Sequence, residues 1–132
     1  MITDQYVTYE VAKLAKEKGF DVQTFGWYDY MGDYHKGFIP HELHECPRYK
    51  EYYAPTQSLL QKWLREEKWL HINVDYNHTN KSWTPTIIRM CCIPTRDTPY
   101  RLDLPSSSSY EVALEKALIY ALNMLPSRET SK

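Results

Sequence analysis

The chain has 132 residues and a formal net charge of −1, from 16 lysines and arginines against 17 aspartates and glutamates. This length favours one folded domain, and the balanced charge lacks the dense basic stripe that is typical of proteins binding nucleic acid through its phosphates. Apolar runs are only a few residues long, far below the roughly 20 that cross a bilayer, so a membrane protein is not expected.

The first expected element is a helix from Thr8 to Lys18. Thr8 has the side chain of an N-cap, and the apolar side chains that follow it recur at helical spacing. Gly19 can adopt the left-handed conformation that ends many helices, with Phe20 folding back on the last turn. Together these signals predict a short amphipathic helix with both ends defined.

Two strands and a long loop are expected next. The β-branched and aromatic residues from Asp21 to Tyr30 predict a strand, and Tyr34 to Ile39 predicts its partner after a turn at Met31-Gly32-Asp33. Pro40 ends this hairpin because proline has no amide hydrogen to donate. The residues from His41 to Tyr53 show no clean periodicity and predict a connecting loop.

The stretch from Ala54 to Tyr76 changes its hydrophobic period and organises the expected fold. Its first half has apolar side chains at helical spacing, namely Leu59, Leu60, Trp63 and Leu64. From Leu70 to Tyr76 apolar and polar residues alternate, which is the pattern of a strand with one buried face. A helix that leads directly into such a strand gives the rest of the chain a surface to pack on.

Two further strands and a helix complete the expected order. Trp83 to Ile93 and Tyr100 to Leu104 predict strands that form an antiparallel meander with the preceding one. Pro85 lacks an amide hydrogen, which indicates a sheet edge or a bulge at that point. Ser108 and Glu111 have the spacing of a capping box at the start of the last helix.

These elements predict a single α+β domain over residues 1–126, followed by a polar tail at 127–132. The expected order is α-β-β-α-β-β-β-α, with a mostly antiparallel sheet and helices packed on one face. The start of the chain has no basic or apolar leader, so a cytoplasmic protein is expected. Cys46, Cys91 and Cys92 are expected to be reduced thiols, because neighbouring cysteines in a strand point to opposite faces.

A metal site is the first candidate for chemistry. His41, His44 and Cys46 lie close together in the sequence and carry side chains that bind zinc. A structural zinc site needs four ligands, usually as two close pairs, and the sequence offers no clear second pair. A polar loop that contains histidines by chance is therefore the favoured interpretation, and no cofactor is expected.

Catalysis receives less support than binding. The sequence has no G-x-S-x-G elbow, no glycine-rich phosphate loop and no H-E-x-x-H helix. Asp29 and Asp33 flank a turn, where aspartate usually makes local hydrogen bonds. Sites assembled from distant residues leave no such motif, so a metal-dependent enzyme stays the third alternative, with no catalytic residue assigned.

Aromatic side chains gather on both sides of one predicted turn and on the loop that follows it. Tyrosine and tryptophan are enriched in protein interfaces, and the charged neighbours here are mainly acidic. Two interpretations remain open: a surface for an unknown protein partner, or rings that cover the core of a small domain. The candidate interaction residues are Trp27, Tyr28, Tyr30, Tyr34, Tyr49, Tyr52 and Tyr53.

Nucleic acid is the alternative partner. Four basic residues fall in the later predicted strands and turns, and they could contact phosphates if the fold brought them together. A steep loss of binding with added salt would indicate such contacts. The candidate residues are Lys81, Arg89, Arg96 and Arg101.

Several segments carry a resemblance to a known family. They are TYEVAKLAKEKGF at 8–20, APTQ at 54–57, LQKWLRE at 60–66, HINV at 71–74 and YEVALE at 110–115. With these segments the chain resembles a family of small uncharacterised proteins from gut Bacteroidetes, their phages and their integrated elements, while residues 22–53 depart from it. The resemblance implies an accessory protein of a phage or mobile element, in the host cell or on the virion, and carries over no catalytic or ligand residue.

Overall fold

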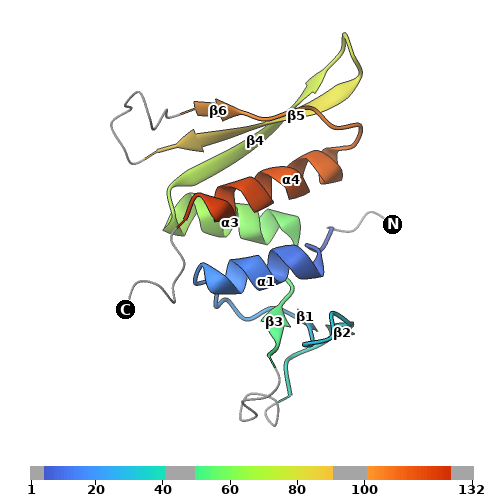
Figure 1. The fold of residues 1–132 in the computed structure, drawn as a ribbon, viewed down its shortest axis with the longest axis vertical. Helices are drawn as coiled ribbons and strands as arrows, with labels where there is room; N and C mark the ends of the chain where they lie inside the picture. Colours follow the sequence, from blue (N-terminus) through green and yellow to red (C-terminus); the bar gives the residue numbers. More distant parts are fainter. Residues whose placement is uncertain (1–4, 41–49, 91–100, 126–132) are drawn as a thin grey trace. The chain divides into compact units, whose positions relative to one another are not determined.

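The computed structural model describes residues 5–40, 50–90 and 101–125 of the chain. These residues form three α-helices and two three-stranded antiparallel sheets, which confirms the α+β class. The chain divides into two compact units, one of residues 1–56 and 125–132 and the other of residues 57–124. Each unit contains one of the two sheets (Figure 1).

The first unit begins with helix α1 (Tyr9–Glu17), as the sequence predicts. At its N-terminus the Val11 amide donates a hydrogen bond to the Thr8 hydroxyl over 3.4 Å. Just past its C-terminus Gly19 has a φ of 102°, and the Phe20 amide donates to a carbonyl of the last helical turn. The chain therefore folds back on the helix and buries the Phe20 ring.

Three short strands form the sheet of the first unit, in the order β2-β1-β3. Strand β1 (Gly26–Tyr28) pairs antiparallel with β2 (Tyr34–Lys36) on one side and with β3 (Tyr52–Tyr53) on the other. The predicted hairpin is confirmed with shorter strands, because Gly37, with a φ of 107°, turns the chain out of β2. Strand β3 falls in the stretch predicted as a loop, since two residues are too few to show a strand period.

The second unit confirms the change of hydrophobic period. Helix α3 (Gln57–Glu67) is followed at once by strand β4 (Leu70–Asn77), which buries Leu70 and Ile72. Trp69 joins the two elements with a φ of 59°, a left-handed conformation that ends the helix and starts the strand. The buried apolar stripe of α3 consists of Leu60, Trp63 and Leu64, with Leu59 half-buried.

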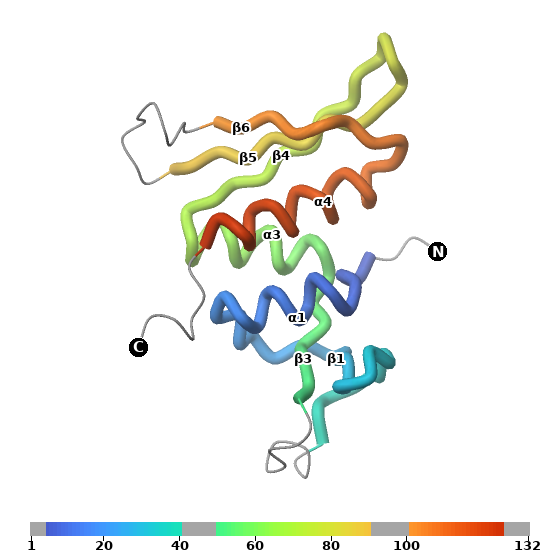
Figure 2. Tube along the Cα trace, viewed as in Figure 1, coloured from blue at the N-terminus to red at the C-terminus, as the bar shows by residue number. Residues whose placement is uncertain are grey.

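Strands β5 (Ser82–Arg89) and β6 (Arg101–Asp103) complete the predicted meander with β4. Figure 2 follows the chain through the long β4–β5 hairpin. The rest of the stretch predicted as strand after Arg89 lies mostly outside the described residues. Helices α3 and α4 (Tyr110–Asn123) both pack on this sheet, on the same face of it (Figure 1).

A β-bulge interrupts the pairing beside Pro85. Thr86 pairs with Asp103, and Trp83 pairs with Ser107. Two residues, 84 and 85, therefore lie between these pairs on one strand, and three residues, 104–106, lie between them on the other. Pro85 lies between these two pairs and has no amide hydrogen to offer the neighbouring chain. The prediction of an edge or a bulge at this proline is therefore confirmed as a bulge.

Helix α4 has its N-cap one residue later than the sequence predicts. The Ser109 hydroxyl accepts a hydrogen bond from the Val112 amide over 3.1 Å. The predicted box of Ser108 with Glu111 is wrong, because the chain stays extended through Ser109, whose φ and ψ are −130° and 153°. An N-cap residue must have such non-helical angles, so the helix begins at Tyr110.

Most buried residues of the second unit are apolar, and its buried polar residues among those described are Gln57, Thr86 and Ser107. Gln57 is buried, and its side-chain amide donates to the Glu111 carbonyl over 3.0 Å and to Glu115 Oε1 over 2.8 Å. These bonds join the start of α3 to the start of α4. The largest buried apolar side chains of this unit are Leu60, Leu64, Ile72, Ile87, Leu114, Leu118 and Leu122.

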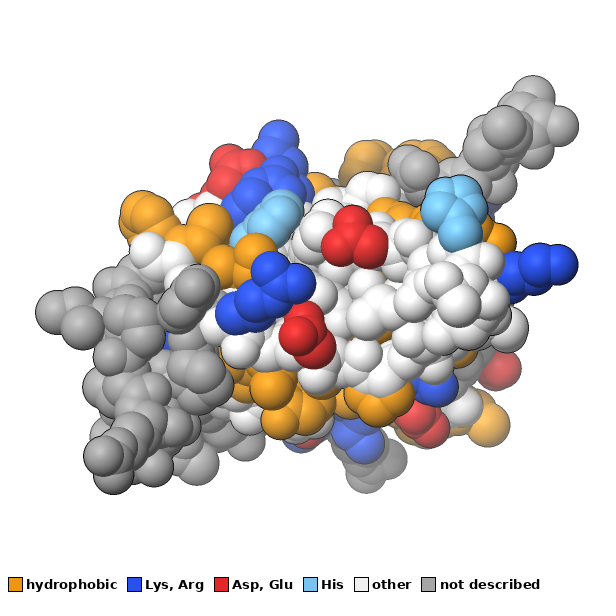
Figure 3. Space-filling model, turned by 90° about the horizontal axis from the view of Figure 1, so that it is seen from above, with side chains coloured by type: hydrophobic (Ala, Val, Ile, Leu, Met, Phe, Trp, Pro, Cys, Tyr) orange, Lys and Arg blue, Asp and Glu red, His pale blue; other side chains and the backbone are white. Residues whose placement is uncertain are grey.

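The opposite face of this sheet is polar. Asn73, Thr86 and Asp103 form one row across the three strands, and the Thr86 hydroxyl donates to Asp103 Oδ1 over 3.0 Å. Figure 3 looks onto this side and shows mainly uncharged polar groups, with charges of both signs scattered among them. Within the described ranges, no helix has the length and apolar character that crossing a membrane requires.

Candidate functional site

A connected network of tyrosine rings spans the first unit. Tyr9 of α1 has its ring 5.7 Å from those of both Tyr28 and Tyr52, in edge-on contacts. Tyr28 in turn contacts Tyr34 across the hairpin at 5.6 Å, and Tyr34 contacts Tyr6 at 5.5 Å. Edge-on contacts of this kind are favourable beyond simple burial, so the network holds the short strands against α1.

The predicted interaction residues divide between core and surface. Trp27 and Tyr52 are only 5% and 7% exposed and belong to the core of the first unit. Tyr30 and Tyr34 are 50% and 41% exposed, so they can contact a partner. Of the others, Tyr28 and Tyr53 are half-buried, and Tyr49 lies outside the described residues.

Exposed apolar side chains that the sequence did not single out extend this surface. Phe25 and Phe38, at the open end of the hairpin, are 54% and 60% exposed, and their rings meet edge-on at 5.1 Å. Met31 at the turn and Tyr6 before α1 are also exposed. We call the following set the aromatic surface: Tyr6, Phe25, Tyr30, Met31, Tyr34 and Phe38.

Close packing holds the two sides of the hairpin together under this surface. The Tyr34 ring lies so near Gly26 that a methyl group added there would come within 2.8 Å of Tyr34 Cζ. The Gly37 amide donates to the Phe25 carbonyl over 2.8 Å, which brings Phe38 beside Phe25. Gly26 thus leaves room for the Tyr34 ring, and Gly37 closes the other end of the hairpin beside Phe25.

The hairpin also carries a hydrogen-bonded pair, His35 and Asp29. The His35 ring stacks on Trp27 at 4.3 Å, and His35 Nε2 lies 2.7 Å from Asp29 Oδ2. Asp29 Oδ1 accepts hydrogen bonds from the amides of Met31 and Asp33, as expected for aspartate in a turn. The hydrogen bond from His35 is the main cause that lowers the pKa of Asp29, and the two amides act in the same direction.

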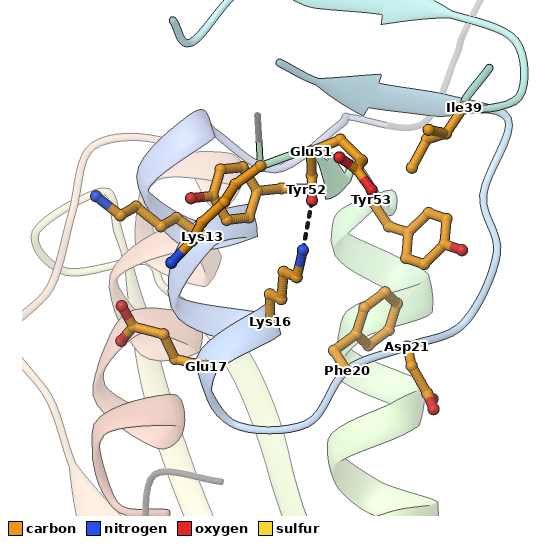
Figure 4. Close-up of a pocket in the computed structure, with 10 residues that line it drawn as sticks. Lys13, Lys16, Glu17, Phe20, Asp21, Ile39, Glu51, Tyr52 and Tyr53 are labelled. Carbon is orange, nitrogen blue, oxygen red and sulfur yellow. Dashed lines mark hydrogen bonds between the residues drawn. The ribbon is translucent and has the colours of Figure 1, made fainter. Parts of the chain in front are cut away.

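A cavity of about 460 Å³ opens in the first unit between α1 and the residues that lead into β3 (Figure 4). Lys16 crosses this cavity: its Nζ donates to the Glu51 carbonyl over 2.9 Å and lies 5.2 Å from the centre of the Tyr52 ring. Lys13, Phe20 and Tyr53 of β3 form further parts of the wall. The cavity thus combines ammonium groups with aromatic rings, which suits an amphipathic ligand.

Two tyrosines of this unit have raised pKa values. Burial is the main cause of the raised pKa of Tyr52, and the neighbouring Tyr9, Glu17 and Glu51 add to it. Burial also raises the pKa of Tyr34, with a further contribution from its hydrogen bond to Tyr6. Both hydroxyls therefore stay protonated at neutral pH and act as neutral hydrogen-bonding groups.

Of the basic residues predicted for the nucleic-acid alternative, the three that the structure describes do not form one stripe. Arg101 lies opposite Ile88 and Arg89 lies opposite Leu70, so the two arginines point to opposite faces of the sheet. Arg101 also forms an ion pair of 3.3 Å with Asp103. Lys81 lies in the hairpin turn at the far end of β5, and Arg96 lies outside the described residues.

The metal candidates His41, His44 and Cys46 lie outside the described residues. Among the residues that are described, no group of three or more potential ligand side chains is close enough to hold a metal ion. Comparisons of the chain with protein-family models, with curated proteins and with solved structures found no match. The aromatic surface and the cavity, both in the first unit, are thus the candidate functional sites of the described residues.

Proposed function

We propose that this protein is a binding module, not an enzyme, and that it contacts a partner protein through the aromatic surface of its first unit. The observation that carries this proposal is the edge-on pair of Phe25 and Phe38, both more than half exposed. Fully burying one such side chain contributes roughly 1.5–3 kcal/mol, so a partner that covered the pair would gain substantial affinity.

Other residues of the hairpin support a protein partner. Tyr30 and Tyr34 add large side chains that have an apolar body and a hydroxyl, a combination enriched at the energetic centres of interfaces. Asp29 and Asp33 lie in the turn, at the other end of the hairpin from Phe25 and Phe38, so a partner that also carries basic residues would match this surface. Nucleic acid is disfavoured there, because carboxylates repel phosphates.

The resemblance of the sequence supports a biological setting for this interaction. We propose that the protein is an accessory component of a phage or mobile element of gut Bacteroidetes, working in the host cell. The segments that carry the resemblance lie mainly outside the hairpin, whereas residues 22–53 depart from it.

Site-specific photocrosslinking tests the proposal. Phe38 is replaced by p-benzoylphenylalanine, and the purified full-length protein is irradiated in a Bacteroidetes lysate. Tyr120 of helix α4 is replaced in the matched control, because it is also exposed but belongs to the second unit. We expect a discrete protein adduct from position 38 that is absent from position 120 and that mass spectrometry identifies.

A second variant ties the adduct to the aromatic surface. Phe25→Ser removes the partner ring of Phe38 and should weaken binding to the identified protein by about tenfold or more. Circular dichroism checks that the variant stays folded. Equal adducts from positions 38 and 120 would contradict the proposal, and an adduct that nuclease removes would favour the nucleic-acid alternative instead.

A further inference from the structure

The cavity of the first unit combines apolar and charged side chains. In Figure 4 the rings of Phe20 and Tyr53 and the side chain of Ile39 lie on one side of Lys16, with Asp21 beside Phe20. Phe20 is buried, while Tyr53 and Ile39 are half-buried and still present surface to the opening. These three side chains form a slot that can receive one large apolar group.

Lys16 places an ammonium group at the edge of this slot. Its bond to the Glu51 carbonyl and its position beside the Tyr52 ring hold Nζ in place and leave further N–H groups to donate. Lys13 and Lys50 also line the cavity and form no ion pair within the described part of the chain. A carboxylate beside Lys16 would therefore lie close to an ammonium group that attracts it.

Acidic residues limit the charge that the cavity accepts. Glu17, Asp21 and Glu51 offset the charge of the three lysines, so the cavity has no excess of positive charge to hold a ligand with several negative charges. The carboxylates can also accept hydrogen bonds from N–H groups of a ligand. The matching ligand has one carboxylate, one large apolar group next to it and nearby N–H donors.

We propose that this cavity binds the free C-terminus of a partner protein whose last residue is large and apolar. A C-terminal residue carries its carboxylate, side chain and N–H group within a few bonds of one another, and capture of that carboxylate is a recurring mode of recognition. The apolar side chain enters the slot and the carboxylate accepts hydrogen bonds from Lys16 Nζ. This inference rests on the proposed function, because it names the segment of the partner that the first unit recognises.

The cavity has a suitable size for this ligand. Its volume of about 460 Å³ falls within the range of roughly 300–1,000 Å³ that is usual for sites that bind small ligands. One terminal residue and part of the residue before it can therefore enter together. Longer segments of the partner would remain outside, free to reach other parts of the first unit.

Selection from a peptide library tests the proposal. The probe is a library of random heptapeptides displayed with free C-termini, applied to the immobilised full-length protein. We expect enrichment of leucine, phenylalanine or a similar side chain at the last position. For an enriched peptide, amidation of the C-terminus should weaken binding by about tenfold or more, since it removes the charge that Lys16 contacts.

Two variants locate the binding in the cavity. Lys16→Met should remove the difference between the free and the amidated peptide, while Lys36→Met on strand β2, outside the cavity, should preserve it. Ile39→Trp fills the slot and should abolish binding without loss of the ammonium group. Circular dichroism confirms that each variant is folded.

Three results would overturn the inference. It is wrong if the library shows no enrichment at the last position, if amidated peptides bind as well as free ones, or if internal acidic residues are selected instead. If the adduct at position 38 forms normally in the Lys16→Met variant and the library gives no enrichment, the interaction module stands and C-terminal capture is wrong. If terminal peptides bind but no adduct forms at position 38, the cavity is the binding site and the aromatic surface is not.

Discussion

At the scale of the residue, Asp29 links the turn of the hairpin to its second strand. Oδ1 receives the two turn amides and Oδ2 receives His35, so one carboxylate orders the residues between β1 and β2. Folding lowers the pKa of Asp29 below its ordinary value of 3.8. The folded state therefore binds fewer protons at this group than the unfolded state in the pH range where the carboxyl titrates.

This difference predicts how stability depends on pH. The contribution of Asp29 to the free energy of unfolding is fully present above pH 3.8, the ordinary pKa. It is lost as the pH falls below 3.8 and through the lowered pKa of the folded state. His35→Ala should move the Asp29 pKa back toward 3.8, because the largest cause of the shift is removed. NMR titration of the Asp29 carboxyl carbon measures both values, and an unchanged pKa in the variant would contradict the assignment.

The same scale shows what sequence patterns could predict about the site. The concentration of tyrosine around one turn correctly drew attention to the hairpin. It could not separate Trp27, which is buried under the His35 ring, from Tyr30, which faces solvent, because three-residue strands are too short to show an alternating pattern. Phe25 and Phe38 left no signal, since only the close approach at Gly37 brings them together.

At the scale of the element, the start of helix α4 depends on one serine among four. Ser109 caps the helix and Ser108 does not, although Glu111 lies at capping-box spacing from Ser108 and not from Ser109. Local spacing alone therefore favours the wrong serine. The extended angles of Ser109, with φ −130° and ψ 153°, place the N-cap at this residue instead.

The two serines therefore make a matched pair of variants. Ser109→Ala should lower the free energy of unfolding by about 1 kcal/mol, because the Val112 amide loses its acceptor. Ser108→Ala should leave it nearly unchanged. Urea denaturation followed by circular dichroism measures both, and equal losses in the two variants would place the cap at neither residue alone.

Long elements were predicted better than short ones, for a physical reason. Helix α3 and strand β4 each present several residues to the core, so their hydrophobic period is visible in the sequence. Strand β3 has two residues and its pairing with β1 is set by contacts distant in the chain. Likewise, Lys16 and Glu51 of the cavity are 35 positions apart in the sequence, so no local motif could predict their contact.

At the scale of the whole molecule, each compact unit has its own buried residues. Val11, Ala15 and Phe20 lie in the core of the first unit, and Leu64 and Leu118 lie in the core of the second. The sequence predicted one domain over residues 1–126, and its apolar content alone could not show how the core is divided. Compact units of one protein can open with different free energies, so one unit can exchange its amide hydrogens before the other.

Hydrogen exchange measured by mass spectrometry tests this division. Val11→Ala and Leu118→Ala each remove buried methyl groups at a cost on the order of 2 kcal/mol. Val11→Ala should speed exchange in residues 1–56 and leave 57–124 protected, and Leu118→Ala should do the reverse. Faster exchange throughout the chain in both variants would show a single cooperative unit instead.

The serine run before α4 has the composition of a flexible spacer, but its length is fixed by the fold. Ser107 exchanges two backbone hydrogen bonds with Trp83, of 2.8 and 2.9 Å, and the helix begins three residues later. Removing one serine would rotate α4 by roughly 100° about its axis, because a helix has about 3.6 residues per turn. Leu114 and Leu118 would then turn away from the sheet. The length of the serine segment therefore determines which face of the last helix is buried.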